Sequence, residues 1–205
     1  IKLVGAPLAL LVDALLLLIS AAILRGIVIH EEPAAGRSAD FMRDLKAGVR
    51  FVARHRLLIA LALTVGGWQM CHNAAIVVQI LFATRTLGLS EQAVGLSYVG
   101  MGAGTVLASV LGHRISARIG PGPSLVLGIA VCGAGWLMLA FAPVNAYGIA
   151  AFALMLMLFS VGAVFMFINF LALRQAVTPA PLLGRMTSTM RWLILLPAGP
   201  GAIIG

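Results

Sequence analysis

The stretch RGIVIHEEPAAGRSADFMRDLKAGVRFVARHR, from Arg25 to Arg56, decides how this chain is organised. It is the one long polar passage in the 205-residue sequence, with seven of the 14 Lys and Arg residues and four of the six acids. The sequence on both sides of it is strongly apolar. We therefore interpret residues 25–56 as a loop between hydrophobic helices.

Composition indicates the class of protein. Hydrophobic residues make up 61% of the chain and charged residues 10%, whereas a soluble domain carries about 25% charge. The sequence therefore predicts an all-α polytopic membrane protein, with the lipid bilayer as its first partner. The net charge of +8 could indicate nucleic acid. Because the basic residues lie singly or on loops beside apolar spans, lipid headgroups are the nearer anion, and we expect no nucleic acid.

Six apolar segments are long enough to cross a hydrocarbon core of roughly 30 Å at about 1.5 Å per residue. Prolines and glycines within the last segment predict that it is interrupted, and Arg191 is expected near its beginning. Asp13 in the first segment is either a functional carboxylate or a structural group near the outer end, and we favour the structural role. The predicted spans are residues 5–24, 57–83, 92–112, 124–142, 147–173 and 186–205.

The second part of the polar loop has the pattern of an amphipathic helix. Phe41, Leu45, Gly48, Val49 and Val52 recur at helical spacing. Cations occupy the other side, which predicts a helix lying on the membrane surface; a regulatory partner site is the alternative. These cations are Arg43, Lys46, Arg50 and Arg54.

A polar stripe runs along the second predicted span. Gln69, His72, Asn73 and Gln79 lie at helical offsets that place them on one face. Unpaired amides do not face lipid, so this face meets either another helix, through hydrogen bonds, or a cavity. We favour a substrate cavity, and because His72 titrates near neutral pH it is the candidate for proton coupling. Weaker members of the cavity wall are Tyr98, Thr105 and Asn169.

The third span carries small residues four positions apart. Such a face lets helix backbones approach closely, which favours packing in lipid. We therefore assign a packing role to Gly100, Gly104, Ala108 and Gly112.

Basic residues alternate between the two ends of the predicted spans. Twelve of them fall on the side of the 25–56 loop, and Lys2 and Arg85 on the other. Positive residues concentrate on the cytoplasmic side of membrane proteins. The distribution therefore predicts that the 25–56 loop is cytoplasmic.

The sequence contains no pattern that indicates an enzyme. It has no His-Glu-x-x-His motif, no cluster of acids and no phosphate-binding Gly-Lys-Ser/Thr loop. Cys71 and Cys132 fall within apolar spans and have no spacing typical of a disulfide framework or a metal site. We expect no catalytic residues, no metal and no cofactor.

The order of one helix, a long basic loop and then short-looped helices resembles a transporter of the major facilitator superfamily. The turn from Gly112 to Gly122 resembles the cytoplasmic signature of that family: Arg118 matches its Arg and Gly120 its Gly. Ala117 replaces the signature's Asp, and a Pro-Gly pair replaces its terminal basic pair. The turn geometry, rather than the charge pattern, is what carries over.

Three further segments are similar to the branch that contains the enterobactin exporter and related drug or macrolide exporters. They are Gly5 to Ala14, Phe51 to His55, and Leu173 to Pro179 followed by Leu183-Gly-Arg185. This resemblance covers the whole chain and makes its spans the sixth to eleventh of twelve helices. Residues 1–24 would end the N-terminal half, residues 25–56 would join the halves, and residues 57–205 would form five helices of the C-terminal half. The rest of the N-terminal half would lie outside this sequence.

The resemblance implies export of a small amphipathic molecule, such as a drug, a macrolide or a siderophore-like compound. Alternating access with proton antiport in the cell inner (plasma) membrane is the implied mechanism. In that fold the seventh, eighth, tenth and eleventh helices line the cavity. Coupling through an acid in the missing half competes with His72, and we favour that acid. Alternative functions are a permease subunit of another transport system and a non-transporting polytopic membrane protein.

Overall fold

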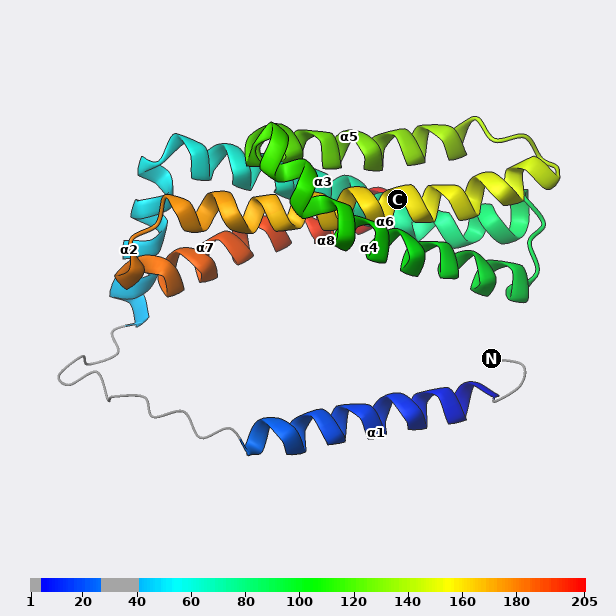
Figure 1. Ribbon diagram of the computed structural model, residues 1–205, viewed down its shortest axis with the longest axis horizontal. Helices are drawn as coiled ribbons and strands as arrows, with labels where there is room; N and C mark the ends of the chain where they lie inside the picture. The colour runs from blue at the N-terminus through cyan, green and yellow to red at the C-terminus, as the bar shows by residue number, and fades with distance from the viewer. Residues whose placement is uncertain (1–4, 27–40) are drawn as a thin grey trace. The chain divides into compact units, whose positions relative to one another are not determined.

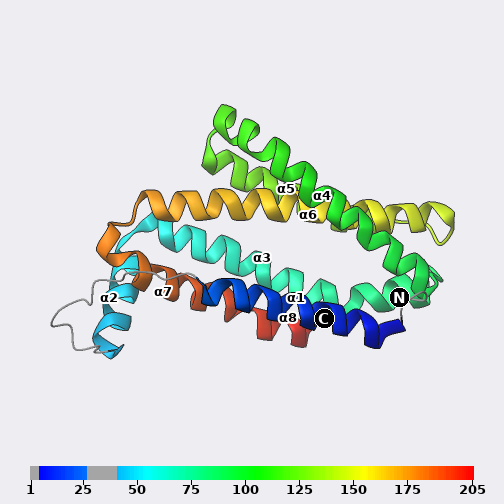
Figure 2. The same cartoon turned by 60° about the horizontal axis from the view of Figure 1, so that its bottom comes forward.

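The computed structural model describes residues 5–26 and 41–205, and in these ranges the chain is helical (Figures 1 and 2). Lys2 and residues 27–40 of the predicted loop lie outside the described residues. The chain divides into two units, residues 1–39 and residues 40–205. The first unit contains α1 (Gly5–Arg25), which coincides with the first predicted span. Its assignment to the membrane remains a prediction.

The second unit is an up-and-down helix bundle (Figure 1). Four of its helical segments are long and apolar enough to cross a membrane, by length and composition: Arg56–Thr86, Glu91–Ile119, Pro121–Ala140 and Ala146–Ala176. This confirms the predicted all-α polytopic class. The helices are α2 (Phe41–Arg54), α3 (Arg56–Leu81), η1 (Phe82–Thr86), α4 (Glu91–Ile119), α5 (Pro121–Ala140), α6 (Ala146–Ala176), the 3₁₀ turn η2 (Ala180–Leu182), α7 (Leu183–Leu195) and α8 (Ala198–Ile204).

The last predicted span, residues 186–205, consists of two short helices. The break between α7 and α8 falls at Leu196 and Pro197, where proline removes a backbone donor and its ring disfavours continuation of the helix. α7 also begins three residues before the predicted span. Arg191 is consequently the ninth residue of α7 rather than a residue near the beginning of the helix, and the expectation for its position was wrong.

The interior is organised around α6, which packs against α4 on one side and α5 on the other. The small-residue face of α4 lies against α6: a Cβ on Gly104 would meet Met157 and Ser160, and Ala108 is 3% exposed. On the α5 side, a Cβ on Gly128 would lie 2.7 Å from the carbonyl oxygen of Gly162. Close approach of the backbones allows van der Waals packing, which stabilises helix association in lipid, where the hydrophobic effect does not drive it.

α3 packs against α7 and α8. A Cβ on Gly66 would lie 3.3 Å from the carbonyl oxygen of Leu193, and one on Gly201 would meet the carbonyl of Met70. These contacts place the two short helices beside the middle of α3.

The amphipathic helix α2 packs against α7. Gly48 is buried, and its Cβ would lie 2.8 Å from the carbonyl oxygen of Arg185. An ion pair of 2.8 Å joins Asp44 to Arg185 across the same contact. One edge of α2 is therefore anchored to the bundle, while the predicted cationic side, Arg43, Lys46, Arg50 and Arg54, is exposed.

Candidate substrate-binding site

The predicted polar stripe lies along α3, but its members differ in environment. Gln69, His72 and Asn73 are half-buried, and Gln79 is 4% exposed. The amide of Asn73 donates to the backbone oxygen of Gln69 at 2.8 Å, so this side chain is satisfied by its own helix. The first three residues are thus accessible in part, and Gln79 is enclosed.

Gln79 connects α3 to α4. Its Nε2 donates to the hydroxyl of Tyr98 at 3.4 Å. The same glutamine borders an apolar hollow of about 200 Å³ between α3, η1 and α5. It supplies a hydrogen-bonding group at the edge of a surface that is otherwise apolar. The residues that line the hollow are Ala75, Val78, Gln79, Phe82, Trp136, Leu139 and Ala140.

His72 lies in an aromatic cluster. Its ring stacks on Phe159 of α6, with centroids 4.5 Å apart, and on Trp68 of α3 at 5.3 Å. Trp68 and Phe159 are themselves stacked at 5.8 Å. Phe167 and Trp136 meet this group edge-on, so that it joins α3, α5 and α6. We call Trp68, His72, Phe159, Phe167 and Trp136 the ring cluster.

The Nδ1 atom of His72 is buried and has no hydrogen-bond partner among the described residues. The imidazole stabilises this part of the bundle mainly through its flat face. Each offset-stacked or edge-to-face ring pair adds about 0.5–1.5 kcal/mol of stability beyond that from the buried area. Stacking, rather than a hydrogen bond from Nδ1 to a described residue, therefore holds this ring.

Two of the three weaker predicted members of the cavity wall, Thr105 and Asn169, satisfy their polar groups locally. Thr105 is exposed and donates to the backbone oxygen of Met101 at 3.0 Å. Asn169 is 2% exposed and donates to that of Phe165 at 2.7 Å. Hydrogen bonds join Gln79 to Tyr98 and Asn73 to Gln69. Among the described residues, neither Thr105 nor Asn169 is hydrogen-bonded to another predicted member of the site.

Sequence reasoning did not select Trp68, Trp136 or Phe159 for the site. Trp68 could have been found, because it precedes His72 by four positions and shares its helix face. The contact of Phe159 with His72 spans 87 positions of the chain and has no signature in local periodicity.

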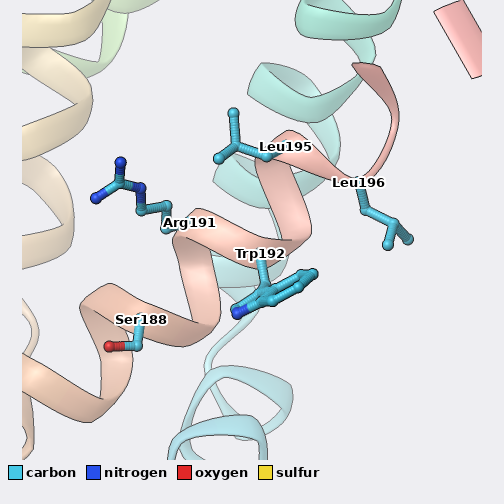
Figure 3. A pocket seen from close by; sticks show the side chains of 5 residues that line it. All are labelled: Ser188, Arg191, Trp192, Leu195 and Leu196. Carbon is cyan, nitrogen blue, oxygen red and sulfur yellow. The ribbon is translucent and has the colours of Figure 1, made fainter. Parts of the chain in front are cut away.

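A second hollow, of about 420 Å³, lies on α7 (Figure 3). Ser188 and Arg191 extend from the same side of the helix, and Trp192 lies on an adjacent face. The Ser188 hydroxyl donates to the backbone oxygen of Gly184 at 3.0 Å. The lining residues are Ser188, Arg191, Trp192, Leu195 and Leu196.

The turn that resembles the family signature joins α4 to α5. Gly112 is buried against Phe165, and Arg118 is exposed in the last turn of α4. Gly120 has a φ of +86°, a value that residues other than glycine rarely adopt. The glycine thus makes the reversal possible.

Within residues 5–26 and 41–205, no group of three His, Cys, Asp or Glu side chains could hold a metal ion. Cys71 is exposed and Cys132 is buried, and both are free thiols.

Comparison with known proteins identifies the family. The sequence profile of the Major Facilitator Superfamily matches residues 1–202. No curated protein and no solved structure gives a significant match. Members of this family are secondary active transporters, which move small molecules across a bilayer, and are not enzymes. With a profile match over nearly its whole length and four candidate membrane spans, the chain belongs to the Major Facilitator Superfamily.

Proposed function

We propose that this transporter exports a small amphipathic molecule by alternating access coupled to proton antiport, as in the branch of the enterobactin exporter and related drug or macrolide exporters. One observation carries the proposal: α3 carries both Trp68 and His72, whose rings stack on Phe159 of α6, and Gln79, which is hydrogen-bonded to Tyr98 of α4. Flat apolar faces with a few hydrogen-bonding groups suit a molecule that has both an apolar body and polar substituents.

The proposed organisation follows the family. Residues 1–24 form the last helix of the N-terminal half, residues 25–56 form a cytoplasmic connection, and residues 57–205 belong to the C-terminal half in the cell inner membrane. The cavity wall is formed by α3, α4, α6 and the α7–α8 pair. The rocking of two halves around a site at the membrane midplane would then expose the rings of α3 and α6 to each side in turn.

Two routes for proton coupling follow from this arrangement. In the first, His72 binds the proton, since it is a titratable group at the cavity wall with an unpartnered Nδ1 among the described residues. In the second, an acid outside these residues binds it and His72 serves as a stacking surface. The aromatic neighbours of His72 favour the second route, because stacked rings offer no counter-charge to an imidazolium.

Transport of amphipathic probes by the full-length protein in proteoliposomes tests the function. Rhodamine 6G, erythromycin and carboxyfluorescein are supplied separately, and proton flux is followed with an internal pH-sensitive dye. We expect proton movement opposite to that of at least one probe. Trp68→Ala should reduce this transport at least five-fold, whereas Tyr147→Ala, at a position 77% exposed at the start of α6, should leave it unchanged. Probe movement that is independent of a proton gradient would refute antiport.

A further inference from the structure

We infer that the hollow on α7 is an anion-binding part of the substrate path, in which Arg191 binds a carboxylate, sulfonate or phosphate group of the transported molecule. This inference rests on the proposed transport function, because it treats the hollow as a surface that the substrate reaches. It adds a charge preference that neither the ring cluster nor the family match provides.

The position of Arg191 along the axis of the bundle is the first argument. A Cβ on Gly66 of α3 would lie 3.3 Å from the carbonyl oxygen of Leu193, so these two residues lie at the same level. Gly66 follows Arg56, the first residue of α3, by ten positions, which is about 15 Å of helix. Arg191 is two residues before Leu193, so its backbone lies about 12 Å along the bundle axis from the level of Arg56. A cation at that depth is costly unless it faces water, a partner or a ligand.

The surroundings of Arg191 are the second argument. Arg191 is exposed and has no ion pair or hydrogen bond with any residue that the structure describes. The described acids of the second unit are Asp44 and Glu91. Asp44 is paired with Arg185, and Glu91 opens α4 at the opposite end of the bundle. The described part of this unit thus provides no carboxylate to neutralise Arg191.

The shape and lining of the hollow are the third argument. Its volume of about 420 Å³ falls within the range of small-molecule sites, roughly 300–1,000 Å³. Trp192, Leu195 and Leu196 form the apolar part of its lining. In Figure 3, Leu195 lies on the side toward which the guanidinium extends, whereas Trp192 and Leu196 extend away from it. Because the guanidinium is a planar fork of donors, it binds two oxygens of one anionic group. The hollow therefore matches a molecule with an anionic group attached to an apolar body.

The face of α7 that packs on the protein is separate from this hollow. Met186, Thr189, Met190 and Ile194 are buried, and none of them lines it. A substitution at Arg191 should consequently leave the packing of α7 intact. A headgroup phosphate has the same chemistry, but a headgroup lies at the membrane surface, and the depth of Arg191 favours a molecule that enters the transport path.

Binding measurements on the full-length protein in phosphatidylcholine nanodiscs test the inference. Carboxyfluorescein serves as the anionic probe and rhodamine 6G as the cationic one, both followed by fluorescence anisotropy. We expect Arg191→Gln to weaken carboxyfluorescein binding at least ten-fold and to change rhodamine 6G binding less than two-fold. Arg191→Lys should be intermediate, and Arg191→Glu should reverse the preference. Arg85→Gln, which removes an exposed cation at the other end of the bundle, is the control and should bind as the wild type does.

Equal losses for both probes would show a structural role for Arg191 and would overturn the inference, as would failure of the wild type to bind carboxyfluorescein. If phosphatidylglycerol is retained by the wild type but not by Arg191→Gln, and it abolishes probe binding, the site belongs to a lipid headgroup and the inference also falls. Arg191-dependent binding without proton-linked transport would refute the proposed export while supporting the anion site.

Discussion

Replacing His72 by two different residues separates the contribution of its ring from that of its ionisable nitrogen atoms. His72→Ala removes the stacked contacts with Trp68 and Phe159. At about 0.5–1.5 kcal/mol for each pair, the loss is about 1–3 kcal/mol of unfolding free energy, before any loss of buried area. His72→Phe keeps a ring in the same position. Since Nδ1 has no partner among the described residues, this variant should lose less than about 0.5 kcal/mol.

The unfolding free energy of each variant is measured by titration with sodium dodecyl sulfate in mixed micelles, with tryptophan fluorescence as the signal. The order should be wild type, then His72→Phe close to it, and His72→Ala clearly lower. Proton-coupled transport measured on the same preparations then isolates the titratable group. If His72→Phe is as unstable as His72→Ala, the imidazole nitrogens rather than the stacked ring stabilise this part of the bundle, and our account of the cluster is refuted.

Four further predictions concern helix contacts. Gly104→Leu should cost about 1–3 kcal/mol, because its side chain would meet the backbone of Met157, whereas Gly102→Leu, which faces open space, should fold as the wild type does; equal yields of folded protein would contradict this. Asp44→Asn should lower stability by at most about 1 kcal/mol, since both partners of its ion pair are partly exposed. Gly48→Val should release α2 from α7, which would be detected as faster proteolysis near Arg54. Slow proteolysis of the valine variant would show that α2 is held by other contacts. A double-mutant cycle of Gln79→Ala and Tyr98→Phe should give a coupling of about 0.6 kcal/mol, and a value near zero would show that their hydrogen bond is absent in the bilayer.

Most of the helices could be predicted from the sequence, because long apolar segments separated by short polar turns leave few alternatives in a membrane. The predicted spans 57–83 and 147–173 correspond to α3 with η1 and to α6, which extend a few residues further at their polar ends. The interruption of the last span was indicated by Pro197. The start of α7 at Leu183, three residues before the predicted span, was missed, and it makes Arg191 the ninth residue of that helix.

The candidate site was less predictable. Helical offsets placed Gln69, His72 and Asn73 on one face of a helix, but they could not identify what that face meets. The stacking of His72 on Phe159 depends on how α3 and α6 are aligned, which is determined by packing between helices distant in sequence. Thr105 and Asn169 illustrate the converse, since a polar side chain in a span can be satisfied by the backbone of its own helix.

The break between α7 and α8 also has a mechanical meaning. In an unbroken helix the carbonyl of Leu193 would accept from the backbone nitrogen of residue 197, but proline has no N–H to donate. This oxygen instead faces Gly66, where the absence of a side chain leaves room for it. Bending at this point therefore breaks no hydrogen bond of the Leu193 carbonyl, although backbone bonds elsewhere in a membrane helix are costly to open. Of the backbone bonds near this break, the one that Leu193 would accept is missing, so a change in the angle between α7 and α8 costs less here than in a continuous helix.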